Sequence, residues 1–364
     1  MKKIICLMCL CVMMCGAAGA VSAQAACLID ADTGDVLFEQ NADARLPMAS
    51  TTKIMTALVA LSDGNLDRTY KVKKEYTLVE GSSMYLQEGE EITLRDTLYG
   101  LMLSSGNDAA VAIAGECGGQ QAFVEKMNQK AEELGLKDTH FDNPNGLDGE
   151  THYTTAHELG KITAAAMHDP LFRQIVSTKS YTAGVHAMSN HNRLLSMYDG
   201  AVGVKTGFTK RSGRCLVSAA ERNGRTLIAV TLNAPDDWND HMAMLNDGFA
   251  QYEEVTLHEA GEVVGEQRVY GGDADTVPLI TQSKLTAYLL PDEIDQLQTV
   301  FYRDKICYAP VVKTAAAGRM EYRLGDQALA SDTILYGGAS ILIPEHKSLP
   351  ERLLERFFGG KDET

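Results

Sequence analysis

The chain has 364 residues, 45% of them hydrophobic and 23% charged, and carries a formal net charge of −16 at pH 7. This size and composition indicate a globular protein of two or three domains. The acidity disfavours nucleic-acid binding, which needs a basic surface, and no basic cluster follows Lys2 and Lys3.

The first 23 residues have the pattern of a secretory signal peptide. A positive start, "MKK", precedes an apolar run over 4–14 that is too short to span a bilayer as a stable helix, and the small residues "VSA" at 21–23 form a cleavage site. The pair Met14-Cys15 fits a lipoprotein site poorly. We therefore expect residues 1–23 to be removed and the mature protein to work outside the cytoplasmic membrane.

Residues 24–254 combine strand and helix patterns. Apolar residues at helical spacing predict helices over 50–61, 92–103, 108–117, 120–136, 155–168 and 238–252. Apolar runs bounded by turn residues predict a hairpin over 27–38 and strands over 200–209, 215–223 and 226–234. Because the strands lie at both ends of the region, we expect an α+β domain in which one antiparallel sheet is flanked by helices.

From residue 255 the pattern changes to short strands separated by turn residues, which predicts a small all-β domain over 255–345. The expected strands cover 261–272, 276–282, 285–290, 306–312, 317–325 and 327–336. Residues 346–364 form an amphipathic tail in which Leu349, Leu353 and Phe357 repeat at helical spacing. Such an apolar face fits either a membrane anchor lying in the interface or a helix docked on the β domain.

Four cysteines remain after signal cleavage: Cys27, Cys117, Cys215 and Cys307. They are scattered and form no Cys-x-x-Cys pair, so we expect no zinc site and no other metal site. One disulfide stays open as an alternative. A chain of this size does not need one, however, and buried free thiols are the expectation.

Three short motifs carry the chemistry, and each occurs once. Ser50 precedes Lys53 by three residues at the head of an apolar helix, so the two side chains converge on one face. Ser105-Gly106-Asn107 lies between two expected helices, and Lys205-Thr206-Gly207 lies on an expected strand. The three motifs stand in the order, and on the element types, that serine acyl-transfer enzymes of the penicillin-recognising group require.

The motifs sit in longer matching stretches: "LPMASTTKIMTAL", "YGLMLSSGNDAAVAIA", "FDNPNGLD" and "GVKTGFTKRSGRCLVSAAERNGRTLIAV". These resemble the serine-type D-alanyl-D-alanine carboxypeptidases, the low-molecular-mass penicillin-binding proteins. The resemblance covers 26 to about 252 and continues more weakly through "YAPVVK" and "AGRMEY". It implies a penicillin-binding/β-lactamase-like transpeptidase domain over 24–254, followed by the small β domain. Glu158 is a small difference from the family pattern, which often has aspartate at this position.

The resemblance implies that the substrate is a peptidoglycan stem peptide ending in D-Ala-D-Ala, that β-lactams acylate the enzyme, and that no cofactor is needed. Ser50 is then the nucleophile and Lys53 its base. A lysine must lose its charge to act as a base, and burial together with a neighbouring cation, here Lys205, lowers its pKa. Ser105 is a candidate proton relay to the leaving amine.

The other motif residues are candidates for holding the substrate. Asn107 is expected to donate to the substrate amide or to Lys53. Lys205 and Thr206 suit the terminal carboxylate, and Gly207 leaves room for the substrate backbone. The oxyanion hole needs two N–H groups, one from Ser50 at its helix start and, by resemblance, one from Phe208.

Three other functions remain open at this point. A class A β-lactamase uses the same motifs, but the chain has no Glu-x-x-Leu-Asn between the second and third motifs and carries an added β domain. A peptidoglycan transpeptidase differs only in accepting an amine instead of water. A non-catalytic penicillin-binding sensor would keep the same fold.

Five residues outside the motifs also need an interpretation. Asn145, His152 and His157 are best explained as polar residues of a surface loop, since they lack ligand spacing. Trp238 is expected in the core or at a helix end. Arg193 is a candidate for reaching a carboxylate in the cleft.

Overall fold

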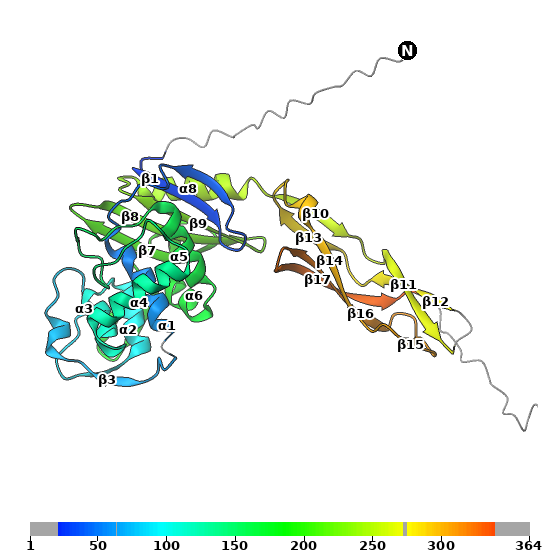
Figure 1. Cartoon of the computed structure of the whole chain (residues 1–364), viewed down its shortest axis with the longest axis horizontal. Coiled ribbons are helices and arrows are strands. Elements are labelled where there is room, and N and C mark those ends of the chain that lie inside the picture. The colour runs from blue at the N-terminus through cyan, green and yellow to red at the C-terminus, as the bar shows by residue number, and fades with distance from the viewer. Residues whose placement is uncertain (1–20, 63, 272–274, 339–364) are drawn as a thin grey trace, which may run out of the picture. The chain divides into compact units, whose positions relative to one another are not determined.

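The computed structural model describes residues 21–62, 64–271 and 275–338 (Figure 1). Contacts along the chain divide it between Gln251 and Tyr252 into two compact units. The signal segment up to residue 20 and the tail over 346–364 lie outside the described residues. No helix in the described part of the chain is long and apolar enough to cross a membrane.

The first unit is built on a five-stranded antiparallel sheet in the order β2-β1-β9-β8-β7. Its strands are β1 (Ala25–Asp30), β2 (Val36–Gln40), β7 (Ala201–Thr209), β8 (Gly213–Arg222) and β9 (Arg225–Leu232). The predicted assembly of one sheet from both ends of the region is therefore confirmed. All eight residues of β9 are buried, as expected of an apolar strand covered on both faces.

Helices cover both faces of this sheet: α8 packs on β8 and β9 from one side, and α5 packs on β1 and β9 from the other (Figure 1). The helical elements of the unit are η1 (Ala49–Thr52), α1 (Lys53–Leu61), η2 (Lys74–Thr77), α2 (Leu94–Leu103), α3 (Asn107–Glu116), α4 (Gln120–Glu133), α5 (Ala156–Met167), α6 (Pro170–Ser177), α7 (Leu194–Met197) and α8 (Asp237–Phe249). Helix α6, which the sequence did not predict, starts at Pro170, and the Asp169 carboxylate caps it by accepting from two backbone N–H groups.

Helix α1 is the centre of the helical layer. It packs against α2, α3, α4, α5 and α6, and most of its residues are buried. A helix that is apolar on every side must be surrounded by other elements. Because other helices surround α1, its first residue, Lys53, is held in a defined place. Two small hairpins complete the unit: β3 (Thr69–Lys71) with β4 (Glu91–Thr93), and β5 (Ser180–Ala183) with β6 (His186–Ser189).

The second unit is rich in β-structure, as predicted, and consists of a two-stranded and a six-stranded sheet. Its strands are β10 (Glu253–His258), β11 (Val263–Tyr270), β12 (Thr276–Thr281), β13 (Leu285–Leu289), β14 (Gln298–Arg303), β15 (Cys307–Tyr308), β16 (Ala316–Leu324) and β17 (Gln327–Tyr336), with η3 (Ile294–Gln296) between β13 and β14. Strands β10 and β14 were not predicted, because three of the six residues of β10 and five of the six of β14 are exposed, so neither strand shows the alternation of a half-buried strand.

The four cysteines of the described chain are free thiols. Cys27, Cys117 and Cys215 are buried, as expected, whereas Cys307 is only half-buried. The expectation of burial is wrong for Cys307 because it lies in the two-residue strand β15. That strand pairs only with β11, and so one side of it is uncovered.

Candidate active site

Ser50 lies in the 3-10 turn η1, directly before α1, and Lys53 is the first residue of that helix. The turn is held by its own hydroxyl groups: Thr51 Oγ1 donates to the Met48 carbonyl at 2.6 Å, and Thr52 Oγ1 donates to the Ala49 carbonyl at 2.8 Å. The backbone therefore presents Ser50 and Lys53 on the same side, as the spacing predicted.

The Lys53 ammonium group has three acceptors within hydrogen-bond distance. Nζ lies 2.9 Å from Ser50 Oγ, 2.7 Å from Asn107 Oδ1 and 2.5 Å from the Asn145 carbonyl oxygen. Two of these are amide oxygens, which can only accept. A neutral amine has two N–H groups and one lone pair, so its N–H groups satisfy the two amides. The lone pair then faces the Ser50 hydroxyl, the one partner that can donate.

Two features favour this neutral amine. The Lys53 side chain is fully buried, and burial is the largest cause that lowers its pKa well below the ordinary value. The positive charge of Lys205 lowers the pKa further, while the negative charge of Asp108 opposes both. Lys205 thus lies close enough to act on Lys53.

The second motif lies at the turn between α2 and α3. Ser105 has a positive φ of 57°, a backbone conformation that is uncommon for serine. Asn107 accepts from Lys53 through Oδ1, and its Nδ2 donates to the Glu80 carbonyl at 2.6 Å. The expectation that Asn107 donates to Lys53 is wrong, because Asn107 Oδ1 accepts from Lys53. One N–H of Nδ2 is bound to Glu80, and the second stays available for the predicted donation to the substrate.

The third motif lies on β7, the edge strand next to η1. Lys205 is 1% exposed and donates to the Thr206 carbonyl at 3.0 Å, and burial lowers its pKa to about 7. Thr206 is partly exposed and Phe208 is 66% exposed. A Cβ atom on Gly207 would lie 3.1 Å from the Ser50 nitrogen, so a larger residue would force the strand or the turn to shift slightly.

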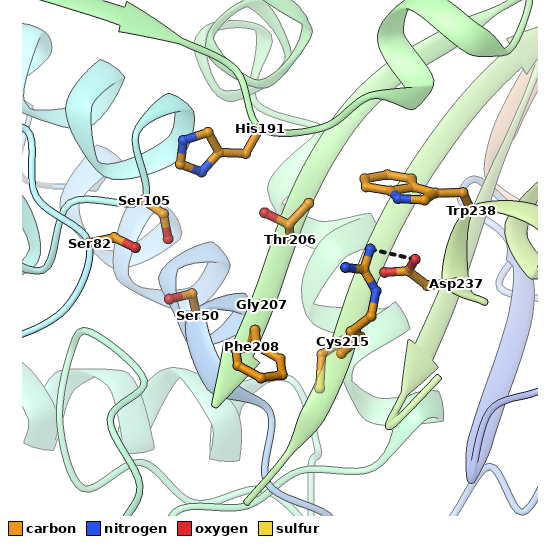
Figure 2. Close-up of a pocket in the computed structure, with 11 residues that line it drawn as sticks. Ser50, Ser82, Ser105, His191, Thr206, Gly207, Phe208, Cys215, Asp237 and Trp238 are labelled. Atoms are coloured by element: carbon orange, nitrogen blue, oxygen red, sulfur yellow. Dashed lines mark hydrogen bonds and ion pairs between the residues drawn. The ribbon is translucent and has the colours of Figure 1, made fainter. Parts of the chain in front are cut away.

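The three motifs meet at one cleft of about 310 Å³ (Figure 2). Ser50, Ser105, Thr206, Gly207 and Phe208 line it, together with residues that the sequence had not assigned to a site: Ser82, His191, Arg214, Cys215, Asp237 and Trp238. The remaining motif residues, Lys53, Asn107 and Lys205, are buried beside the cleft. The structure therefore brings all eight predicted site residues together.

Arg214 is the main residue that sequence reasoning missed. It lies on β8 opposite Phe208 of β7, and its side chain is 42% exposed. Its Nη2 donates to Asp237 Oδ1 at 2.7 Å, and its Cζ lies 5.7 Å from the centre of the Trp238 ring. The sequence did contain a signal for Arg214. A strand that follows the third motif after a tight turn pairs with it in antiparallel fashion, and this pairing places Arg214 beside Phe208.

Three further expectations are corrected. Asn145 and His152 are 5% and 3% exposed, so the assignment to a surface loop is wrong for both: they bind buried parts of the nucleophile's turn and helix. Of the two alternatives for Trp238, the core is wrong and the helix end is confirmed, since it is the second residue of α8; it also lines the cleft. Arg193 lines a separate cavity together with Asn190 and Asn192, and it is not among the residues that line the cleft.

Within the described ranges, no group of three or more histidine, cysteine, aspartate or glutamate side chains is arranged to hold a metal ion.

Comparison with known proteins agrees with this geometry. Residues 13–236 match the D-alanyl-D-alanine carboxypeptidase family, and residues 252–339 match the C-terminal domain of penicillin-binding protein 5. The chain belongs to the D-alanyl-D-alanine carboxypeptidase family. The members of this serine peptidase family act on D-Ala-D-Ala peptidoglycan substrates through an acyl-enzyme and are sensitive to β-lactams.

Individual relatives cover most of the chain. It is 34% identical to the D-alanyl-D-alanine carboxypeptidase DacF of Bacillus subtilis, over 86% of this chain and 84% of the relative. The structure of penicillin-binding protein 5 from Haemophilus influenzae matches with a TM-score of 0.63 and 30% identity, covering 88% of this chain and 98% of that one. The Streptomyces K15 DD-transpeptidase matches with a TM-score of 0.62 and 38% identity, over 64% of this chain and 98% of that one.

Proposed function

We propose that this family member removes the terminal D-alanine from peptidoglycan stem peptides through an acyl-enzyme on Ser50. The observation that carries the residue assignment is the contact of 2.9 Å between Ser50 Oγ and the buried Lys53 Nζ. A serine hydroxyl is a weak nucleophile until a base removes its proton. Lys53 is the one titratable side chain bonded to it among the described residues.

Acylation begins as the Ser50 hydroxyl proton passes to the Lys53 amine and Oγ bonds to the carbonyl carbon of the penultimate D-alanine. The negative charge on the carbonyl oxygen is stabilised by the N–H groups of Ser50 and Phe208. The C–N bond then breaks, and Ser105 relays a proton to the leaving amine of D-alanine. Water hydrolyses the resulting ester and releases the shortened peptide.

The other residues keep these groups in place. Asn107 Oδ1 and the Asn145 carbonyl orient the Lys53 amine, and Lys205 disfavours its charged form. Thr206 receives the terminal carboxylate of the substrate. We assign the charge that pairs with this carboxylate to Arg214, because its half-exposed guanidinium stays charged at all relevant pH values.

The burial of Lys205 supports this division of roles. Its Nζ is bonded to the Thr206 carbonyl, and its pKa is about 7, so it is only partly charged at neutral pH. A carboxylate would have to reach a buried amine whose pKa is lowered to about 7. The guanidinium of Arg214 lines the same cleft and stays charged, although its Nη2 is also paired with Asp237.

The family works on the cell wall, and the signal pattern of residues 1–23 supports export of this member. The amphipathic tail over 346–364 supports a weak attachment to the outer face of the cytoplasmic membrane. Its apolar face combines two aromatic and three leucine side chains, Leu349, Leu353, Leu354, Phe357 and Phe358, with charged residues of both signs around them.

A transpeptidase is the second candidate, because the Streptomyces K15 protein is named both a D-alanyl-D-alanine carboxypeptidase and a DD-transpeptidase. One experiment separates the two functions. The purified protein is incubated with a pentapeptide ending in D-Ala-D-Ala, and both free D-alanine and cross-linked dimer are quantified. D-alanine without dimer supports the carboxypeptidase; dimer in molar excess over hydrolysed peptide supports the transpeptidase.

The nucleophile is tested in parallel with a labelled penicillin. Mass spectrometry should place the adduct on Ser50, and Ser50→Ala should abolish labelling while the circular dichroism spectrum and melting temperature stay unchanged. An adduct on another residue, or no adduct on the folded wild-type protein, would overturn the assignment.

A further inference from the structure

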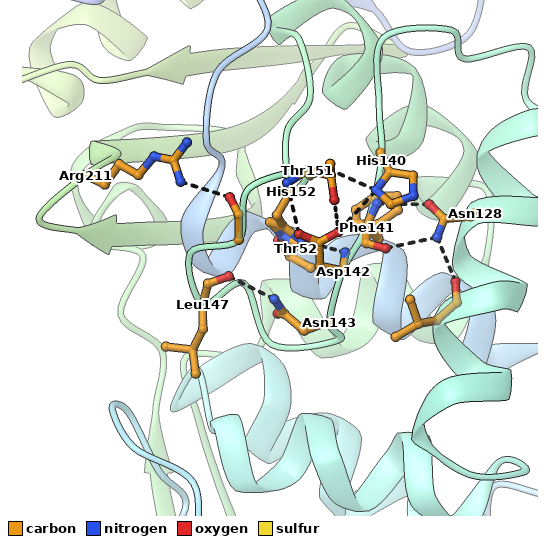
Figure 3. A network of polar contacts seen from close by, with 12 residues as sticks. Thr52, Asn128, His140, Phe141, Asp142, Asn143, Leu147, Thr151, His152 and Arg211 are labelled. Carbon is orange, nitrogen blue, oxygen red and sulfur yellow. Dashed lines mark hydrogen bonds and ion pairs between the residues drawn. The ribbon is translucent and has the colours of Figure 1, made fainter.

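One of the three acceptors of Lys53 comes from a segment without helix or strand. The Asn145 carbonyl lies in the loop over 141–152, whose two ends are joined by the isolated bridge between His140 and Tyr153. A loop that contributes to a site must be held there by specific contacts, because its backbone forms no ladder of its own. Several contacts hold this loop, and among them His152 links it to the turn that carries the nucleophile (Figure 3).

His152 connects the loop to the turn that carries the nucleophile. Its Nε2 lies 2.7 Å from Thr52 Oγ1, and its Nδ1 lies 3.0 Å from the backbone nitrogen of Asp142. A backbone N–H can only donate, so Nδ1 must be the unprotonated, accepting nitrogen. The ring proton is therefore on Nε2 and is donated to Thr52 Oγ1, and the Thr52 hydroxyl donates in turn to the Ala49 carbonyl.

The result is a directed chain of three hydrogen bonds, which runs from Asp142 through His152 and Thr52 to Ala49. Thr52 and Ala49 flank Ser50 in the sequence. The loop also touches the turn directly: a Cβ atom on Gly146 would lie 2.0 Å from the Ala49 carbonyl oxygen, so the glycine backbone is packed against it. Loop and turn are therefore joined both by this chain of hydrogen bonds and by direct packing.

We propose that His152 is a positioning residue: it clamps the loop onto the nucleophile's turn and so places the Asn145 carbonyl and the Ser50 hydroxyl on opposite sides of the Lys53 amine. This inference rests on the proposed roles of Ser50 and Lys53. His152 touches neither of them and acts through Thr52 and through the loop.

A neutral imidazole is suited to this position because it offers one donor and one acceptor in fixed directions. Protonation would turn Nδ1 into a donor facing the Asp142 N–H group. The surroundings prevent this at neutral pH: burial, followed by smaller contributions from His140 and Lys53, lowers the pKa of His152 to about 4, although Asp142 and Asp148 oppose the shift. The edge-on Phe141 ring, 5.9 Å away, contributes to the burial.

The clamp is tested by acylation with a labelled penicillin between pH 5 and 10. In His152→Leu we expect a rate loss of about 10- to 100-fold, the cost of displacing reacting groups by a fraction of an ångström to an ångström. In the plot of acylation rate against pH, the rise on the acidic side should also move to higher pH. Water entering between loop and turn would relieve the burial that lowers the pKa of Lys53, while Lys205 and Asp108, the charged groups facing Lys53, stay in place.

Three further variants separate positioning from folding. His152→Gln keeps a donor and an acceptor on one planar group, and should recover at least tenfold of the lost rate. Thr52→Val removes the hydroxyl with little change in shape, and should reproduce the effect of His152→Leu. His140→Gln is the matched control: His140 bonds to the Thr151 carbonyl of the same loop but not to the turn, so its rate and pH limb should match the wild type.

Each result decides the question. The clamp would be overturned if folded His152→Leu were acylated at the wild-type rate and with the wild-type pH dependence. It would also be overturned if this variant lost rate without a shift of its pH profile and His152→Gln did not restore the rate. If His152→Leu does not fold, Thr52→Val distinguishes the same outcomes by the same criteria. Failure of the wild-type protein to label at Ser50 would instead contradict the proposed function, and the two failures are thereby distinguishable.

Discussion

Gly207 on β7 lies against the backbone of Ser50, and a Cβ atom on Gly207 would come within 3.1 Å of the Ser50 nitrogen. Its other near neighbours would be the Met48 carbonyl and the Ala49 Cβ, at 3.2 Å each. These are atoms of the backbone or fixed directly to it, so no flexible side chain can move aside. The third motif therefore needs glycine to hold the strand at contact distance from the nucleophile.

Gly207→Ala should consequently separate the strand from the turn. We expect acylation by penicillin to fall about 10- to 100-fold and the free energy of unfolding to fall by about 1–3 kcal/mol, the cost of forcing a methyl group into a packed contact. Stopped-flow acylation and urea denaturation measure the two effects. Gly338→Ala is the control, because a Cβ there meets its nearest atom at an ordinary 3.4 Å; equal effects of both substitutions would contradict the argument.

Arg214→Gln should weaken substrate binding. If the guanidinium pairs with the terminal carboxylate, its removal should raise KM for the D-Ala-D-Ala peptide about 10- to 100-fold, as expected for loss of a charge-assisted hydrogen bond, with a smaller change in kcat. Arg211→Gln is the matched control, since Arg211 bonds to the Gly149 carbonyl and does not line the cleft. If KM is unchanged in Arg214→Gln, Lys205 and not Arg214 pairs with the substrate carboxylate.

The pH dependence separates the two lysines. The pKa of Lys53 is lowered in the folded protein, and its neutral form is the base, so acylation should rise with pH through that lowered pKa. Lys53→Arg keeps a charge that is never lost at these pH values, and should abolish acylation. Near-normal acylation of this variant would assign the base to another group.

Lys205 titrates near neutrality, since its pKa is about 7, and it is charged below that pH and neutral above it. If Lys205 held the carboxylate, KM would rise as pH increases from 6 to 9. We expect a flat KM over this range, because Arg214 stays charged throughout. Steady-state kinetics with the D-Ala-D-Ala peptide measure this directly, and a KM that climbs around pH 7 would contradict the assignment.

The sequence predicted the sheet, the main helices and the three motifs because these features repeat locally: apolar spacing of period two or 3.6, and turn residues between the elements. It also indicated that Lys205 lies near Lys53, and the lowered pKa of Lys53, to which the charge of Lys205 contributes after burial, agrees with that prediction. It missed β10 and β14, whose exposed residues carry no apolar pattern.

The polar residues around the site could not be placed in the same way. His152 and Asn145 stand in a loop of Asn, Gly and Pro residues that is typical of a surface turn, and only the folding of this loop onto η1 buries them. The orientation of the Asn107 amide could not be predicted, because its N–H group bonds to the Glu80 carbonyl, 27 residues away in the chain. Arg214 becomes part of the site only because β8 pairs with β7 in one particular register.

The tail over 346–364 leads to the last prediction, which rests on the sequence alone. Pro350 suits a first helical turn, Gly359-Gly360 suits its end, and Leu349, Leu353 and Phe357 repeat at helical spacing between them. The surrounding charges, Glu351, Arg352, Glu355 and Arg356, balance one another. Anionic lipids should therefore add little, and the apolar face must supply the binding energy.

Burial of five large apolar side chains contributes about 1.5–3 kcal/mol each before the cost of ordering the tail, which is enough for a weak and reversible attachment. We expect the mature protein to float with neutral liposomes in a density gradient, and a protein truncated after Glu345 to stay at the bottom. Penicillin labelling of both proteins controls for folding of the catalytic unit. Equal partitioning of the two would refute the anchor and favour docking of the tail on the β domain, because a docked apolar face has no surface left for the lipid.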